Sequence, residues 1–215
     1  MNNSTKFAKV AVLLTGSMLV AGVGTLLGAP IHTLSGIIIT ALLMLGSAIA
    51  VGVFARSAPA PVAVALLGAL TFFTGLCIGP AIAMYVQVLG GNVVLATFFG
   101  TAGIMALCGL IATFSGINFA PLERFLMIGL FGLILVGLIV MFTGMSFAFN
   151  LVYCLAGIAI FVGFFLVDFF RLATSADDTW GGAVEITAQL FLDFANLFLR
   201  LLELIALLSG KKNND

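Results

Sequence analysis

Long apolar runs, separated by short breaks rich in Gly, Pro or polar residues, fill almost the whole of this sequence. Each run is long enough to cross the ~30 Å hydrocarbon core of a bilayer as a helix. The runs lack the alternation of barrel strands, and lipid offers no partner to backbone polar groups, so helices are favoured. We expect Pro80 to bend or break the third helix. The sequence predicts an all-α membrane protein with seven transmembrane helices, at Val10–Ala29, Leu34–Phe54, Val62–Tyr85, Val93–Phe114, Phe125–Phe142, Phe149–Phe170 and Ala183–Leu208.

The composition agrees with a protein that uses the lipid bilayer as its solvent. Of the 215 residues, 63% are hydrophobic and only 7% are charged, too few to cover a soluble domain with so much apolar mass. The zero net charge gives no electrostatic basis for binding nucleic acid. Cys77, Cys108 and Cys154 lie inside apolar runs, a pattern that favours packing over disulfides or a metal site. Because the breaks are short, we expect a single domain over residues 1–215.

The positive residues predict an orientation in the membrane. The first apolar run is too long for a signal peptide, so it is expected to remain as the first helix. With a cytoplasmic N-terminus the three outward loops carry no Lys or Arg, as the positive-inside rule favours. Lys211 and Lys212 in the tail would then lie outside, but two terminal lysines weigh less than five inner cations. These five are Lys6, Lys9, Arg56, Arg124 and Arg171.

The last apolar run carries a stripe of polar residues. At about 100° per residue they fall within an arc of roughly 80° on one helix face. A charged side chain facing lipid costs at least ~2.5–3.5 kcal/mol, so the stripe must face other helices or water. We therefore expect helix 7 to be central, with the other helices around it. The polar stripe consists of Glu185, Gln189, Asp193, Asn196, Arg200 and Glu203.

One further acid, Asp168, lies inside an apolar run. In the orientation above, Asp168, Asp193 and Arg56 are able to meet near the inner mouth. Two close carboxylates in a low-dielectric site do not both ionise cheaply, so one is protonated or a cation lies between them. Such a pair responds to pH and attracts hard cations such as Ca²⁺. The alternative interpretation is that the stripe joins helices by hydrogen bonds and an Arg200–Glu203 pair.

Three segments resemble one known family, the transmembrane Bax inhibitor motif proteins (Bax inhibitor-1-like proteins). LFLDFANLFLRLLELI is similar to its last helix, with an L-D-x-x-N-L-F core, GFFLVDFFRL to its sixth and LTFFTGLCIGPAIAMY to its third. The resemblance extends over nearly the whole chain and implies a seven-helix fold with helix 7 at the centre. It also implies a pH-sensitive calcium leak. By position, Asp168 and Asp193 match the family's pH-sensing pair and Arg56 its arginine partner.

Two segments depart from that family's pattern. GIIITALLMLGSAIAVGVF, the second helix, has no acidic residue, and SGINFAPLER lacks the usual basic-acidic motif. Low charge and short loops favour a bacterial inner membrane, with the endoplasmic reticulum or Golgi as the alternative.

Three functions compete for this sequence. We expect a passive Ca²⁺ leak gated by Asp168 and Asp193 with Arg56 as partner, without a cofactor. The alternative is a membrane regulator that binds a membrane protease or other membrane proteins and transports nothing itself. An intramembrane aspartyl protease is disfavoured because the YD, GxGD and Pro-Ala-Leu sequences are absent. His32 has no nucleophile motif beside it, so we expect no enzyme activity.

Overall fold

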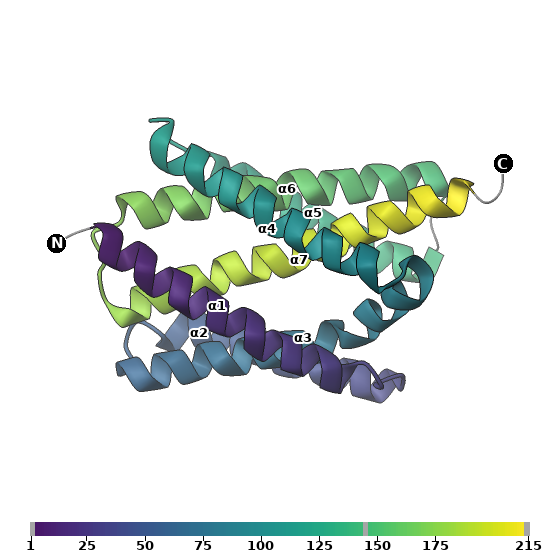
Figure 1. Ribbon diagram of the computed structural model, residues 1–215, viewed down its shortest axis with the longest axis horizontal. Helices are drawn as coiled ribbons and strands as arrows, with labels where there is room; N and C mark the ends of the chain where they lie inside the picture. Colours follow the sequence, from purple (N-terminus) through teal and green to yellow (C-terminus); the bar gives the residue numbers. More distant parts are fainter. Residues whose placement is uncertain (1–2, 144–145, 213–215) are drawn as a thin grey trace. The chain divides into compact units, whose positions relative to one another are not determined.

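In the computed structural model, which describes residues 3–143 and 146–212, all regular secondary structure is helical (Figure 1). Membrane helices satisfy their own backbone hydrogen bonds, which explains why the long apolar runs adopt this conformation. The helices are α1 Asn3–Gly28, α2 Leu34–Phe54, α3 Ala60–Leu89, α4 Gly91–Phe114, α5 Leu122–Thr143, α6 Phe147–Thr174 and α7 Trp180–Lys212.

The seven expected helices are confirmed, and most of them extend beyond the expected ends. The helix α6 continues to Thr174, so Asp168 lies about 9 Å from its carboxyl end instead of in its last turn. The break considered at Pro80 is absent, since α3 runs through it. Pro80 supplies no N–H to the Leu76 carbonyl, but that carbonyl packs against Gly28 of α1, where an added Cβ would lie 2.3 Å from it. A neighbouring helix thus covers the freed group.

Within the described part of the chain, six helices, α1 to α6, are long and apolar enough to span a membrane. Their most apolar windows have mean hydropathies between 2.1 and 2.5. Large apolar side chains such as Leu26 and Phe125 are 77% and 72% exposed, a surface suited to lipid. The helix α7 has 33 residues, enough to cross a bilayer, but its polar stripe sets it apart from the other six.

The chain divides into two compact units. The first unit consists of Met1–Gln87 and Thr174–Leu192, which contain α1, α2, α3 and the first part of α7. Within it, α1 and α3 approach closely through glycines. A Cβ added at Gly75 would lie 2.2 Å from the Ala21 carbonyl oxygen, and one at Gly24 would lie 2.4 Å from that of Phe72. Small residues allow two helix backbones to pack this closely in a membrane.

The second unit consists of Val88–Ala173 and Asp193–Asp215, which contain α4, α5, α6 and the rest of α7. Its aromatic core joins α4 to α7, because the ring centroids of Phe98 and Phe194 lie 5.1 Å apart and those of Phe98 and Phe198 lie 5.8 Å apart. The single domain expected over residues 1–215 stays a prediction.

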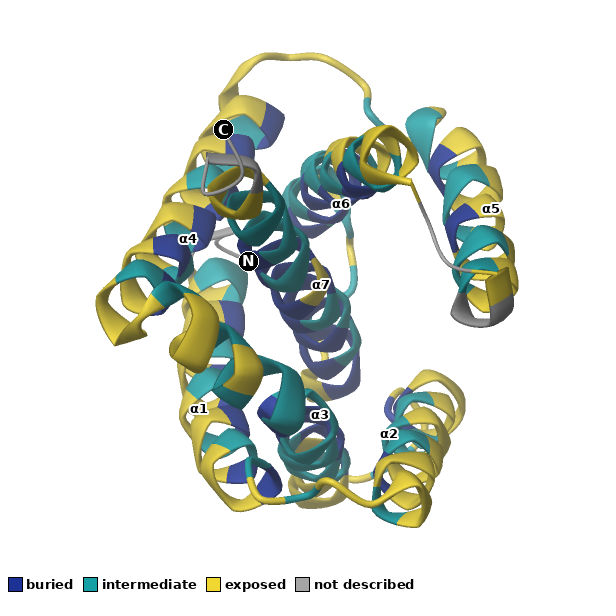
Figure 2. Ribbon diagram, turned by 90° about the vertical axis from the view of Figure 1, so that its right-hand side faces the viewer, coloured by how far each residue is buried: buried dark blue, intermediate teal, exposed yellow. Residues whose placement is uncertain are grey.

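The helix α7 contributes to each unit and contacts many helices, as expected. In the first unit Gly181 approaches the end of α2, where an added Cβ would lie 2.4 Å from the Ala55 carbonyl oxygen. In the second, the Cys154 thiol of α6 donates to the carbonyl oxygen of Arg200 at 3.0 Å. Figure 2 shows how much of α7 is buried, and the side chains of Leu190 and Leu197 are fully enclosed.

Candidate functional site

The second unit contains a pair of buried acids, Asp168 in α6 and Asp193 in α7. Their exposed fractions are 4% and 9%. The two carboxyl groups lie close enough to each other for a hydrogen bond between their side chains. A hydrogen bond between two carboxyl groups needs a proton on one of them. This geometry therefore favours a pair that shares a proton.

One oxygen of the pair has no partner. Asp193 Oδ2 is buried and accepts no hydrogen bond from the residues that the structure describes. An acceptor left unsatisfied in an apolar interior is costly, typically by about 1–3 kcal/mol and more when it is charged. The oxygen is chemically suited to a proton or a cation, because either would remove that cost.

Asp168 has a cationic neighbour on its own helix. Arg171 Nη1 lies 3.9 Å from Asp168 Oδ1, and Arg171 Nη2 donates to Glu123 Oε1 of α5 at 2.6 Å. A chain of charged groups thus runs from the start of α5 through α6 to Asp193 on α7. The Asp168–Arg171 contact was not predicted, although the spacing of three in D-F-F-R places both side chains on one helix face.

Arg56 has a different acid as its partner in the structure. It follows α2 and donates from Nε to Glu185 Oε2, the first acid of the stripe, in the first unit. The Arg56 side chain is 62% exposed, and the hydrogen bond and charge of Glu185 raise its pKa. The role of Arg56 as partner of Asp168 and Asp193 stays a prediction.

The remaining stripe residues keep more contact with solvent than the apolar faces of α7. Asn196 is exposed and Gln189 is half-buried. Arg200 and Glu203 pair at 2.7 Å, with side chains 23% and 24% exposed. Apart from the buried Asp193, the stripe residues are therefore partly accessible, whereas most apolar residues between Ala183 and Phe198 are buried.

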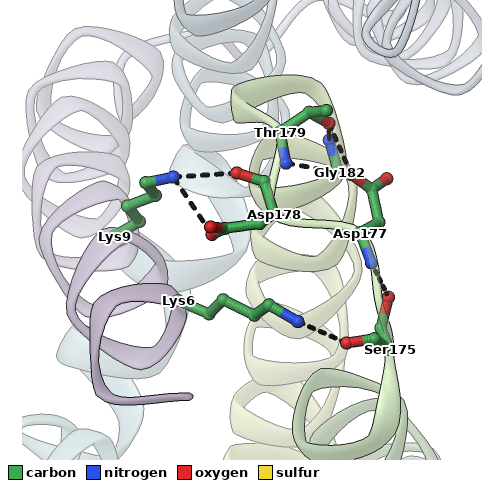
Figure 3. A network of polar contacts seen from close by, with 7 residues as sticks. All are labelled: Lys6, Lys9, Ser175, Asp177, Asp178, Thr179 and Gly182. Carbon is green, nitrogen blue, oxygen red and sulfur yellow. Dashed lines mark hydrogen bonds and ion pairs between the residues drawn. The ribbon is translucent and has the colours of Figure 1, made fainter. Parts of the chain in front are cut away.

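A lysine cluster joins α1 to the loop that precedes α7 in the first unit (Figure 3). Lys9 Nζ donates to the Asp178 carbonyl oxygen at 2.8 Å and lies 3.2 Å from its Oδ1, and Lys6 Nζ donates to the Ser175 carbonyl oxygen. Lys9 also lies 5.5 Å from the centroid of the Trp180 ring. Lys6 and Lys9 are therefore at the same end of this unit as the beginning of α7.

The same loop is stabilised from within. Asp177 Oδ1 accepts from the Thr179 hydroxyl at 2.7 Å and from its backbone N–H at 2.9 Å, and these hydrogen bonds lower the pKa of Asp177. The Thr179 hydroxyl in turn accepts from the Gly182 N–H in the first turn of α7 at 3.0 Å. The beginning of α7 is capped by this arrangement.

The described residues contain no group of three or more His, Cys, Asp or Glu side chains that could hold a metal ion. Ca²⁺ takes six to eight oxygen ligands when it is held tightly. Two carboxyl groups supply fewer oxygens than that. The predicted Ca²⁺ contacts of Asp168 and Asp193 stay a prediction.

The six long apolar helices among the described residues mark this chain as an integral membrane protein. The chain belongs to the family described as "Inhibitor of apoptosis-promoting Bax1", whose model matches residues 4–211. This confirms the resemblance to the Bax inhibitor-1-like proteins, which are generally non-enzymatic membrane proteins.

Two curated relatives are similar over about two thirds of this chain. One is "Bax inhibitor 1" from Schizosaccharomyces pombe, 27% identical over 144 residues, which are 67% of this chain and 52% of that protein. The other is an uncharacterized protein from Chlamydia muridarum, 27% identical over 157 residues, which are 68% of this chain and 66% of that protein. The matches thus cover from about half to about two thirds of these relatives.

Proposed function

We propose that this protein is a passive, pH-sensitive cation leak with Ca²⁺ as its cargo, gated by the pair of Asp168 and Asp193. The unpartnered, buried Oδ2 of Asp193 beside a second carboxyl group is the observation that supports this most directly. Ionisable groups inside a membrane are expensive and mark ion or proton pathways. A purely structural pair would instead match an acid with a base.

The gate follows from the charge of the pair. With both carboxyl groups ionised, the pair attracts guanidinium groups, from Arg171 at 3.9 Å and, by resemblance to the family, from Arg56. Protonation discharges the pair and removes that attraction. The contribution to closure is therefore present above the titration range of the pair and is lost as the pH falls through it. Leak should rise in acid.

The cargo follows from the ligands. Carboxylate oxygens are the ligands that hard cations such as Ca²⁺ prefer. A site with few ligands binds weakly, and conduction needs binding that is weak enough to release the ion. We propose that the protein spans a bacterial inner membrane. The end of the first unit that carries Lys6, Lys9 and Arg56 then lies in the cytoplasm, because positive residues gather on the cytoplasmic side of membrane proteins.

The test is Ca²⁺ flux into liposomes that contain the purified protein, recorded while the pH is lowered from neutral to mildly acidic. Asp168→Asn and Asp193→Asn keep the side-chain shape and remove the titration, so flux should lose its pH dependence. Asp178→Asn, in the loop before α7, is the matched control and should keep the wild-type response, because Asp178 pairs with Lys9. Arg56→Gln should raise the flux at neutral pH.

Two results would count against the proposal. A pH dependence unchanged in Asp168→Asn and Asp193→Asn would remove the carboxyl pair from the gate. An absence of flux in the wild-type protein at every pH would favour the alternative function, a regulator that binds a membrane protease or other membrane proteins.

A further inference from the structure

A second cluster of charged groups lies further along α7, within the second unit. Arg200 Nη1 donates to Glu203 Oε2 at 2.7 Å, and Arg200 Nη2 donates to Tyr153 Oη of α6 at 3.1 Å. The guanidinium carbon lies 4.5 Å from the centroid of the Tyr153 ring, a cation–π contact. The guanidinium is therefore held by hydrogen bonds to Glu203 and Tyr153 and by the face of the Tyr153 ring.

The surroundings fix the position of this guanidinium. Tyr153 donates its hydroxyl to the Leu133 carbonyl oxygen of α5 at 3.0 Å, so the ring is held in turn. Gly157 makes room for the arginine stem, because a Cβ there would lie 3.0 Å from Arg200 Nε. A planar guanidinium with bound donors has little freedom to turn away. Arg200 is thus a positive charge at a fixed place.

The cluster and the carboxyl pair share one face of α7. Arg200 follows Asp193 by seven residues, which is two turns and about 10.5 Å along the helix axis. The side chains of Arg200 and Glu203 are 23% and 24% exposed. Along this face Arg200 is the next charged residue of α7 after Asp193, and the carboxylate of Glu203 lies beside it.

We propose that the path of the leak continues along this face past Arg200 and Glu203, so that each of the two charges shifts the preference between divalent and monovalent cations, in opposite directions. This inference rests on the proposed function. The electrostatic energy of an ion beside a fixed charge is proportional to the charge of the ion. Removal of one fixed charge therefore changes the Ca²⁺ flux by the square of the factor by which it changes the K⁺ flux. Arg200 opposes entry of a cation, and Glu203 favours it.

The test compares Ca²⁺ and K⁺ fluxes through liposomes at one fixed, mildly acidic pH. Arg200→Gln should raise the Ca²⁺ flux about tenfold and the K⁺ flux about threefold, because the energy doubles with the ion's charge. Glu203→Gln should lower both, and Ca²⁺ more than K⁺. The double variant removes both charges and should return the ratio of Ca²⁺ to K⁺ flux close to the wild-type value.

Two further variants separate charge from structure. Arg200→Lys keeps the positive charge but loses the planar set of guanidinium donors. It should keep the wild-type ratio of Ca²⁺ to K⁺ flux. Arg124→Gln removes an exposed arginine at the start of α5, outside the cluster, and should leave the ratio unchanged. Thermal stability in detergent is measured for each variant. If Arg200→Gln does not fold, Glu203→Gln still tests the inference, because its ratio of Ca²⁺ to K⁺ flux must fall.

The outcomes distinguish this inference from the proposed function. Absence of both fluxes in the wild-type protein overturns the leak and this inference with it. A wild-type leak whose ratio of Ca²⁺ to K⁺ is the same in Arg200→Gln and Glu203→Gln overturns only the inference. A ratio that moves in the same direction in both variants overturns it as well, because opposite charges must act oppositely.

Discussion

The contact between α1 and α3 gives a sharp prediction about a single methyl group. Gly75→Ala adds a Cβ that would lie 2.2 Å from the Ala21 carbonyl oxygen and 3.0 Å from the Thr25 nitrogen. Both neighbours belong to the backbone of α1, so neither can rotate away. The two helices must move apart. Gly68→Ala, on the same helix two turns earlier, adds the same methyl group where no atom lies within 4 Å.

The magnitude follows from two opposing effects. Overpacking of a well-packed contact costs about 1–3 kcal/mol, and a clash between backbones belongs in the upper half of that range. Replacement of a helical glycine by alanine returns about 0.5–1 kcal/mol in either variant. We expect Gly75→Ala to lower the free energy of unfolding by about 1–2 kcal/mol and Gly68→Ala to raise it by about 0.5–1 kcal/mol. The two variants should differ by about 2–3 kcal/mol.

The assay is the temperature at which half of the detergent-solubilised protein leaves the folded peak in size-exclusion chromatography. For a chain of this size 1 kcal/mol corresponds to about 2–4 °C, so the two variants should differ by about 4–12 °C. Equal midpoints, or a higher midpoint for Gly75→Ala, would show that α1 and α3 do not approach as closely as the structure has them.

Two further predictions concern the ends of helices. The hydrogen bonds from Thr179 lower the pKa of Asp177, so their stabilisation is complete above the unfolded pKa and is lost as the pH falls through the lower folded pKa. Protection of the backbone amides of residues 175–179 against hydrogen exchange, relative to the rate of the unfolded chain at the same pH, should therefore fall in strong acid. Asp177→Asn should abolish that change with pH. Arg171 and Glu123 are 33% and 43% exposed, so a double-mutant cycle with Arg171→Gln and Glu123→Gln should give a coupling of no more than about 1 kcal/mol; a coupling of several kcal/mol would contradict it.

The fold was predictable because each helix of a membrane protein corresponds to a long run of hydrophobic residues in the sequence. The bounds of α2 match the expectation, since Thr33 caps its first turn by accepting from the Gly36 N–H at 3.2 Å and Arg56 follows its end. Pro80 shows the limit of local reasoning. Its effect on α3 depends on what covers the Leu76 carbonyl, and that neighbour comes from another helix.

The site was partly predictable for a related reason. The spacing of polar residues places Asp193 and Arg200 on one face of α7, and the sequence shows this directly. The Asp168–Arg171 contact was readable from a spacing of three. Tyr153 was not readable, because it lies 47 positions from Arg200 and only the packing of α6 against α7 brings the two together. Partners on different helices leave no pattern in a single sequence.

The distribution of charges supports a functional role for the carboxyl pair. Four other acids in the described residues have a basic partner within 3.2 Å. These acids are Asp178, Glu185, Glu123 and Glu203, with Lys9, Arg56, Arg171 and Arg200 as their partners. Asp168 and Asp193 are more deeply buried, and the nearest base, Arg171, lies 3.9 Å from Asp168 and is shared with Glu123. Two ionised carboxyl groups in a membrane interior would weaken the fold, and this cost supports the proposal that the pair exchanges protons or meets a passing cation.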